Sequence, residues 1–95
     1  MVTGEQLVLT GHALRRLAER NLTVDDVLSV VNANDVIESY PTDTPYPSVL
    51  GLAFVGGRPV HVCWGLGPAT MVTIITVYVP NPEMWDAAFR VRRTP

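Results

Sequence analysis

The sequence lacks several features that would each indicate a particular class of protein. It contains no lysine, so all seven basic residues are arginine. This absence excludes a phosphate-binding P-loop and any chemistry through a lysine Schiff base. Cys63 is the only cysteine, which excludes an internal disulfide framework and a four-cysteine zinc site. A single thiol also suits a reducing compartment.

Long apolar runs are missing as well. No stretch approaches the length of a membrane span, and the first residues do not combine a basic region with a long apolar segment. We therefore expect a cytoplasmic protein that is neither secreted nor inserted into a membrane. A chain of 95 residues with a hydrophobic fraction of 47% predicts one domain over residues 1–95, with a core from about residue 8 to residue 90.

The charge is small but unevenly distributed. The net charge of −2 argues against a large basic surface that coats nucleic acid. Residues 1–20 hold three arginines and two acids, residues 21–57 hold five acids and no base, and residues 58–95 hold four arginines and two acids. Every cation is thus a planar guanidinium, a group suited to bind carboxylate or phosphate through two hydrogen bonds.

Two amphipathic helices are predicted near the start of the chain. Thr10 can cap a helix over about residues 11–20, and Asn21 can end that helix in the left-handed conformation. Thr23, followed by two aspartates, can cap the next helix. Helical spacing puts four apolar residues on one side of the first helix: Ala13, Leu14, Leu17 and Ala18. The opposite side carries His12, Arg15, Arg16, Glu19 and Arg20.

Beyond residue 35 the pattern changes to strands. Runs rich in β-branched residues predict strands over 36–40, 48–55, 59–64 and 72–79. Gly56 and Gly57 between two runs predict a tight hairpin turn. Asn81 can cap a last helix in which Trp85 and Phe89 share a face. We expect the final residues, VRRTP, to be frayed.

These elements predict an α+β fold. An N-terminal helix pair packs on a four-stranded, mainly antiparallel sheet, and a short C-terminal helix follows. The strands over 48–55 and 72–79 are apolar on both sides. The second face of the sheet therefore needs a cover, which we expect to be the last helix or a partner chain, and so we expect a homo-oligomer.

Several motifs in order resemble a known family. They are HALRRLAERNLTVDDV, VIESYPTDTPYPS, FVGGRPVHVCW and TIITVYVPNPEMW, which together span about residues 10–90. The chain resembles the prokaryotic domain-of-unknown-function 4258 family, with its H-A-x-x-R-x-x-x-R start, Y-P-S loop, G-R-P-x-H-V strand and T-x-Y-x-P close. More distantly it resembles the RelE-like and BrnT-like toxins. That likeness implies a metal-independent endoribonuclease without a cofactor, RNA as its substrate and a small antitoxin as its partner.

The first helix carries residues that suit this chemistry. Cleavage of RNA without a metal requires a base for the 2′-hydroxyl proton, cations for the phosphate and an acid for the leaving oxygen. His12, Arg16 and Arg20 stand at i, i+4 and i+8 on one side of the helix. We predict that His12 is an acid or base and that the two arginines bind phosphate. The alternative is an ordinary solvated face on which these arginines pair with acids such as Glu19.

His61 and Tyr78 are the supporting catalytic candidates. His61 lies mid-strand and can serve as the second acid or base, or it can be a buried residue bonded to the backbone or to a tyrosine. Tyr78, like Tyr40 and Tyr46, can hold a phosphate oxygen or stack on a base, or can simply pack. His61 and Cys63 stand two apart without a second pair of ligands, so no metal site is predicted.

Three functions are compatible with this sequence. The leading hypothesis is a toxin-like, metal-independent endoribonuclease domain of a prokaryotic toxin-antitoxin type system. The second is a non-catalytic protein-interaction or homodimerisation domain of the same fold, which the net charge of −2 favours. The third is a domain that binds a small anion at the arginines of the first helix.

Overall fold

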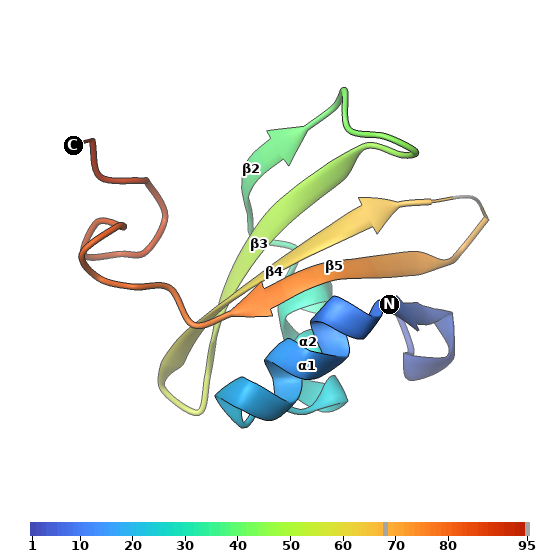
Figure 1. Ribbon diagram of the computed structural model, residues 1–95, viewed down its shortest axis with the longest axis horizontal. Coiled ribbons are helices and arrows are strands. Elements are labelled where there is room, and N and C mark those ends of the chain that lie inside the picture. The colour runs from blue at the N-terminus through green and yellow to red at the C-terminus, as the bar shows by residue number, and fades with distance from the viewer. Residues whose placement is uncertain (68, 95) are drawn as a thin grey trace.

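A twisted sheet carries two helices on one face and the C-terminal segment on the other (Figure 1). The structure is a computed structural model and describes residues 1–67 and 69–94. Five strands lie in the order β1-β5-β4-β3-β2. Their bounds are β1 Leu7–Leu9, β2 Val36–Tyr40, β3 Ser48–Val55, β4 Arg58–Leu66 and β5 Val72–Tyr78. Because β1 runs parallel to β5 while all other pairs are antiparallel, the sheet is mixed.

The prediction of a four-stranded, mainly antiparallel sheet was wrong, because it did not include β1, the fifth strand of a mixed sheet. A strand of three residues is too short for alternation to be recognised, and its partners in β5 lie far along the chain. Gln6 strengthens this contact, since its Nε2 donates to the carbonyl of Thr70 at 3.0 Å. Pairing with β1 covers only the first part of the outer edge of β5, and the rest is left for the helix that follows.

Both predicted helices are confirmed: α1 covers Gly11–Arg20 and α2 covers Val24–Ala33, after a short 3-10 turn, η1, over Gly4–Gln6. Thr10 caps α1 by accepting from the N–H of Ala13, and its hydroxyl also donates to the carbonyl of Ile74. Asn21 ends α1 in the left-handed conformation, with φ of 55°. The cap of α1 therefore also ties the helix to β5.

The main core lies between the helices and the sheet. Its fully buried centre is formed by Ala13, Val27, Val30, Val60, Val62, Ile74 and Val77. The predicted apolar side of α1 is narrower than expected, because Leu14 is 51% exposed and Ala18 is exposed too. This helix packs along β5 at the margin of the sheet, so that a thin stripe of it, including the buried Leu17, reaches the core.

The predicted C-terminal helix is absent from the described residues. After Asn81 the chain turns, and the carboxylate of Asp86 accepts from the N–H groups of Arg90 and Val91. Phe89 has φ of 60°, a left-handed conformation that interrupts a helix. Local hydrogen bonds from an aspartate thus compete successfully with helix formation.

The tail is also better ordered than expected. Trp85 forms an antiparallel bridge with Arg92, and the N–H of Arg93 donates to the carbonyl of Met84 at 2.9 Å. The chain therefore doubles back on itself over residues 84–93, and its expected fraying was wrong. Pro95 lies outside the described residues.

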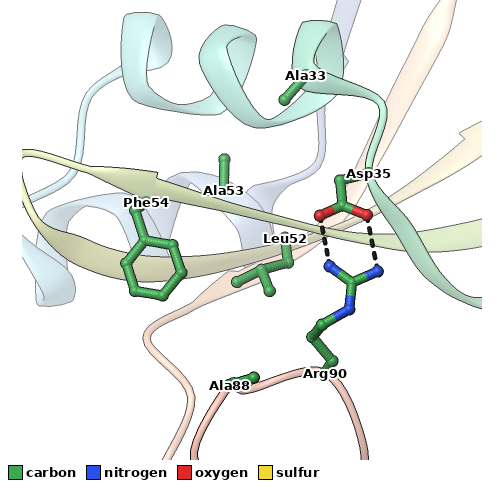
Figure 2. Close-up of a pocket in the computed structure, with 7 residues that line it drawn as sticks. All are labelled: Ala33, Asp35, Leu52, Ala53, Phe54, Ala88 and Arg90. Carbon is green, nitrogen blue, oxygen red and sulfur yellow. Dashed lines mark hydrogen bonds and ion pairs between the residues drawn. The ribbon is translucent and has the colours of Figure 1, made fainter.

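This doubled C-terminal segment, rather than a helix, covers part of the second face of the sheet. Trp85 is only 2% exposed and packs with Leu50 and Cys63 in a second, smaller core. Arg90 ties the segment to the end of α2 through a two-point ion pair with Asp35, at 2.5 and 2.9 Å (Figure 2).

The predicted hairpin turn is confirmed. Gly56 and Gly57 connect β3 to β4 and have φ of 58° and 79°, the positive values that a tight primed turn requires. The expected turn between β4 and β5 includes Pro68, which lies outside the described residues.

Gly51 of β3 provides a test of the main core. A Cβ atom at this position would lie 2.5 Å from the outer ring of Trp64, so Gly51→Ala should lower the free energy of unfolding by about 1–3 kcal/mol through overpacking. Phenylalanine lacks the outer ring carbons, so the same change should cost less in a Trp64→Phe background. Urea unfolding of the four proteins in a double-mutant cycle measures this coupling, and purely additive losses would contradict it.

Candidate functional site

The uncovered part of the second face is lined with hydroxyl groups. Residues paired across neighbouring strands share a face, and the register pairs Tyr40 with Ser48, Gly65 with Thr73, Cys63 with Thr76, and His61 with Tyr78. We call this surface the hydroxyl face and define it by Tyr40, Ser48, Thr73, Thr76 and Tyr78. Ser48 is buried and the other four are half-buried. Such a surface offers mainly acceptor oxygens to a polar ligand, because the hydroxyl protons of Tyr40, Ser48 and Tyr78 are donated within the protein.

His12 lies at the rim of the hydroxyl face. The helix α1 runs beside β5 and in the same direction (Figure 1). At its first turn, the Nε2 atom of His12 lies 3.3 Å from the hydroxyl oxygen of Thr76. The imidazole is exposed and so is accessible to a ligand on the hydroxyl face.

Arg16 and Arg20 follow His12 along the same side of α1. The guanidinium of Arg16 forms a 3.0 Å ion pair with Glu19, and these side chains are 39% and 54% exposed. This is the pairing that the alternative interpretation expected. An exposed pair of this kind contributes no more than about 1 kcal/mol, so the ion pair holds Arg16 only weakly. No hydrogen bond of the Arg20 guanidinium is found within the part of the chain that the structure describes.

His61 occupies a different environment, because its side chain is completely buried. Its Nε2 lies 2.7 Å from the carbonyl of Phe89, and its Nδ1 lies 3.2 Å from the hydroxyl of Tyr78. A carbonyl can only accept, so Nε2 carries the proton. The neutral Nδ1 then accepts, and the Tyr78 hydroxyl donates to it.

This arrangement leaves His61 no free nitrogen for a substrate. Burial lowers the pKa of His61, which keeps the ring neutral, and burial raises the pKa of Tyr78. The ring of Trp85 packs edge-on against that of His61, with 4.5 Å between centroids. The geometry agrees with the alternative in which His61 is a buried residue bonded to the backbone or to a tyrosine. Here it is bonded to both, so that it orients Tyr78 and holds the C-terminal segment.

A charged cluster beside this histidine was not predicted. Arg92 donates to Glu38 at 3.0 Å and lies over the ring of Trp85, and the hydroxyl of Tyr40 donates to the same carboxylate. Burial alone would raise the pKa of Glu38, but the hydrogen bonds from Arg92 and Tyr40 lower it overall. Burial and Glu38 raise the pKa of Tyr40 to about 12. No spacing in the sequence connects positions 38 and 92, so no local pattern could have revealed this cluster.

Among the cavities formed by the described residues, two lie beside the sheet and near the C-terminal segment or the hydroxyl face. One, of about 350 Å³, borders the hydroxyl face and is lined by Asp43, Thr44, Pro45, Tyr46, Gly65, Thr73 and Ile75. The other, of about 420 Å³, lies between the end of α2, β3 and the C-terminal segment, where Asp35 and Arg90 meet (Figure 2). The first cavity is nearer to His12, because Ile75 directly precedes Thr76.

Some site types are not represented in the described residues. Over residues 1–67 and 69–94, no group of three or more histidine, cysteine, aspartate or glutamate side chains could hold a metal ion. No helix in these ranges is both long enough and apolar enough to cross a membrane. Burial raises the pKa of the Cys63 thiol, which disfavours the reactive thiolate.

Comparison with models of known protein families shows to which family the chain belongs. The model of the family described as Domain of unknown function (DUF4258) matches residues 9–79. The chain belongs to the DUF4258 family. The predicted family is thus confirmed, and the matched part of this DUF4258 domain includes His12, Arg16, Arg20, His61 and Tyr78. Comparison with curated proteins and with solved structures finds no match. The likeness to RelE-like and BrnT-like toxins therefore stays a prediction.

The buried neutral His61 makes the stability of this DUF4258 domain depend on pH. The pKa of His61 in the folded state lies below its ordinary value of 6.5. Between these two pKa values, His61 therefore binds a proton in the unfolded chain and does not bind one in the folded chain. The contribution to stability is complete above about pH 6.5 and is lost as the pH falls through the window below it. We expect the free energy of unfolding to fall between about pH 7.5 and about pH 5.5.

His61→Gln is the matched variant, because glutamine can donate to Phe89 and accept from Tyr78 without titrating in this range. Its free energy of unfolding should change less over the same pH interval, whereas His12→Ala should retain the wild-type dependence. Equal pH dependence in wild type and His61→Gln would show that His61 does not cause it.

Proposed function

We propose that this DUF4258 domain is a toxin-like endoribonuclease that cleaves RNA without a metal ion. The observation that carries the proposal is the exposed imidazole of His12, 3.3 Å from Thr76 at the rim of the hydroxyl face. Arg16 lies one helical turn away, about 6 Å further along α1. A group that transfers protons, a cation and a surface of hydrogen-bonding groups are thus adjacent.

In this mechanism the 2′-hydroxyl of the RNA attacks the neighbouring phosphorus. His12 accepts the hydroxyl proton, the new P–O bond forms, and the bond to the 5′-oxygen of the next nucleotide breaks. That oxygen takes a proton from solvent water as it leaves, which gives a 2′,3′-cyclic phosphate and a 5′-hydroxyl end, and His12 returns its own proton to the solvent. The contact with Thr76 orients the imidazole and keeps its reactive side over the hydroxyl face.

Arg16 and Arg20 supply positive charge to the phosphate. Phosphate can replace Glu19 on the guanidinium of Arg16, because the ion pair between these residues is exposed. Tyr78 lies on the same face but already donates its proton to His61, so it contributes its oxygen lone pairs and its ring. In the proposal His61 is a positioning residue that acts through Tyr78 and not a direct acid or base.

The proposal implies two further properties. An enzyme that cleaves the messenger RNA of its own cell would work in the cytoplasm, where the single thiol of Cys63 would also stay reduced. A toxin of this kind needs an inhibitor, and a small antitoxin protein that covers α1 and the hydroxyl face would block the substrate.

A second candidate function is self-association. Within the described residues, β2 pairs with β3 only as far as Gly51, and beyond it the N–H of Leu52 donates to the carbonyl of Asp35. Phe54 follows on this open edge and is 58% exposed. An unpaired strand edge with an exposed aromatic side chain is a typical place for another chain to add.

The nuclease proposal predicts separate effects for His12 and Arg16. His12→Ala should retain RNA binding and reduce cleavage by about a hundredfold or more, because it removes the proton-transfer group. Arg16→Ala should weaken RNA binding and make it less dependent on salt. Arg15→Ala, which removes an exposed arginine from the same helix, is the matched control and should behave like wild type.

Cleavage of a generic mRNA in the presence of a chelator measures the first effect, and salt-dependent binding of a short RNA measures the second. The melting temperature of each variant confirms that it is folded. Equal cleavage by wild type and His12→Ala would remove His12 from the mechanism. Anion binding without any cleavage by wild type would favour a binding domain.

Self-association predicts a concentration-dependent dimer that depends on Phe54. Phe54→Arg should shift the protein to a monomer, because a charge on the open edge of β3 opposes pairing with a second copy. Sedimentation velocity at micromolar concentration measures the change. A wild-type protein that is already monomeric under these conditions would contradict the dimer.

A further inference from the structure

We propose that the 350 Å³ cavity beside the hydroxyl face is a nucleobase subsite, and we call it the base pocket. It is formed by Asp43, Thr44, Pro45, Tyr46, Gly65, Thr73 and Ile75. It would accept a base that carries an exocyclic amino group, namely guanine, adenine or cytosine, in preference to uracil. This inference rests on the proposed function, because it assigns a substrate preference to the same site.

The base pocket has the size and the aromatic wall that a base requires. Its volume lies at the lower end of the range of about 300–1,000 Å³ that is usual for small-molecule sites. Tyr46 is 42% exposed, and its ring lies near the backbone of Gly67, where an added Cβ would be 3.6 Å from the ring. A ring supported in this way offers a free surface on which a base can stack.

Gly65 leaves the floor of the base pocket open. A Cβ atom added there would meet only Ile75 and Thr73, each at 3.9 Å, which is ordinary van der Waals distance. Neighbouring atoms therefore do not require glycine at this position. The absence of a side chain instead preserves the space between Tyr46 and the strands.

Asp43 gives the base pocket a preference for bases that can donate a hydrogen bond. The hydroxyl of Ser48, which is only 1% exposed, donates to the Oδ2 atom of Asp43 at 2.5 Å and orients the carboxylate. Its Oδ1 atom has no hydrogen bond within the described residues. A carboxylate only accepts hydrogen bonds, so it favours the amino group of guanine, adenine or cytosine, whereas uracil has carbonyl oxygens at its corresponding edge.

The position of the base pocket relative to His12 also suits a nucleotide that contacts both. Ile75 lines the pocket and is followed directly by Thr76, the residue that His12 contacts. Successive strand residues are only about 3.3 Å apart. A base in the pocket would therefore belong to a nucleotide whose ribose and phosphate lie at His12, so that the pocket would select the position of cleavage.

Binding of short 2′-O-methyl RNAs tests the subsite independently of cleavage, because the methyl group blocks the attacking hydroxyl. Four fluorescent oligonucleotides that differ in one central base are compared by anisotropy. We expect wild type to bind guanine, adenine or cytosine about tenfold more tightly than uracil. Gly65→Val, which fills the pocket, and Tyr46→Ala, which removes the stacking surface, should reduce this difference to nearly nothing.

Conservative variants separate the contributions. Tyr46→Phe keeps the ring and should bind like wild type, whereas Asp43→Asn adds a donor and should narrow the gap between uracil and the other bases. Met84→Ala is the control, because it removes another large exposed apolar side chain that lies outside the base pocket. Tyr46 lies in an exposed loop, so Tyr46→Ala tests the pocket even if Gly65→Val proves unstable.

The outcomes distinguish the two proposals. Cleavage by wild type with equal affinity for all four oligonucleotides would overturn the base pocket and leave the nuclease proposal intact. Base discrimination that Gly65→Val or Tyr46→Ala abolishes, without cleavage by wild type, would support the base pocket and overturn the nuclease. Absence of both binding and cleavage would overturn both.

Discussion

The hydrogen bond from the buried His61 to the carbonyl of Phe89 holds the C-terminal segment against the sheet, and the form of the second face depends on it. With the segment in place, Trp85 is buried over one part of the face, while the hydroxyl face remains uncovered. The other ring nitrogen accepts from Tyr78, so one imidazole connects the covered part with the open part. The buried histidine therefore separates the covered part of the second face from the open part, and it has no free ring nitrogen of its own.

A second constraint fixes His12 at the rim of this face. Thr10 caps α1 and also donates to the carbonyl of Ile74, so the start of the helix is attached to β5 immediately beyond the short parallel strand β1. His12 lies on the first turn after this attachment, where a helix has little freedom to move relative to the strand. The bulge in the pairing of β4 with β5 places Thr76 opposite Cys63, and so brings its hydroxyl to the open face beside the imidazole.

Local signals predicted the elements, and distant contacts determined what the sequence could not reveal. Thr10, Asn21 and the two glycines of the hairpin act on neighbouring residues, so both helices and the turn were predicted correctly. The strand β1 depends on partners more than sixty residues away. The C-terminal turn depends on the carboxylate of Asp86, whose hydrogen bond with the backbone N–H of Arg90 forms in place of a helix. For the candidate site, the sequence predicted the exposed side of α1. It offered a buried His61 bonded to the backbone or to a tyrosine as one alternative. It could not predict which residues enclose the histidine, because Phe89 and Trp85 come from a segment expected to be helical.

The distribution of arginines bears on the phosphate site that we propose for a protein of net charge −2. Of the seven arginines, four are engaged in contacts that hold the fold: Arg58 with the end of α1, Arg90 with Asp35, Arg92 with Glu38, and Arg93 with the carbonyl of Pro82. The remaining three, Arg15, Arg16 and Arg20, all lie on α1. Within the described residues, the arginines for which no contact with another element is found therefore all lie on one helix beside β5. Under the proposed function, RNA would gain little from long-range attraction to the whole protein and would be held by contacts along α1 and the hydroxyl face.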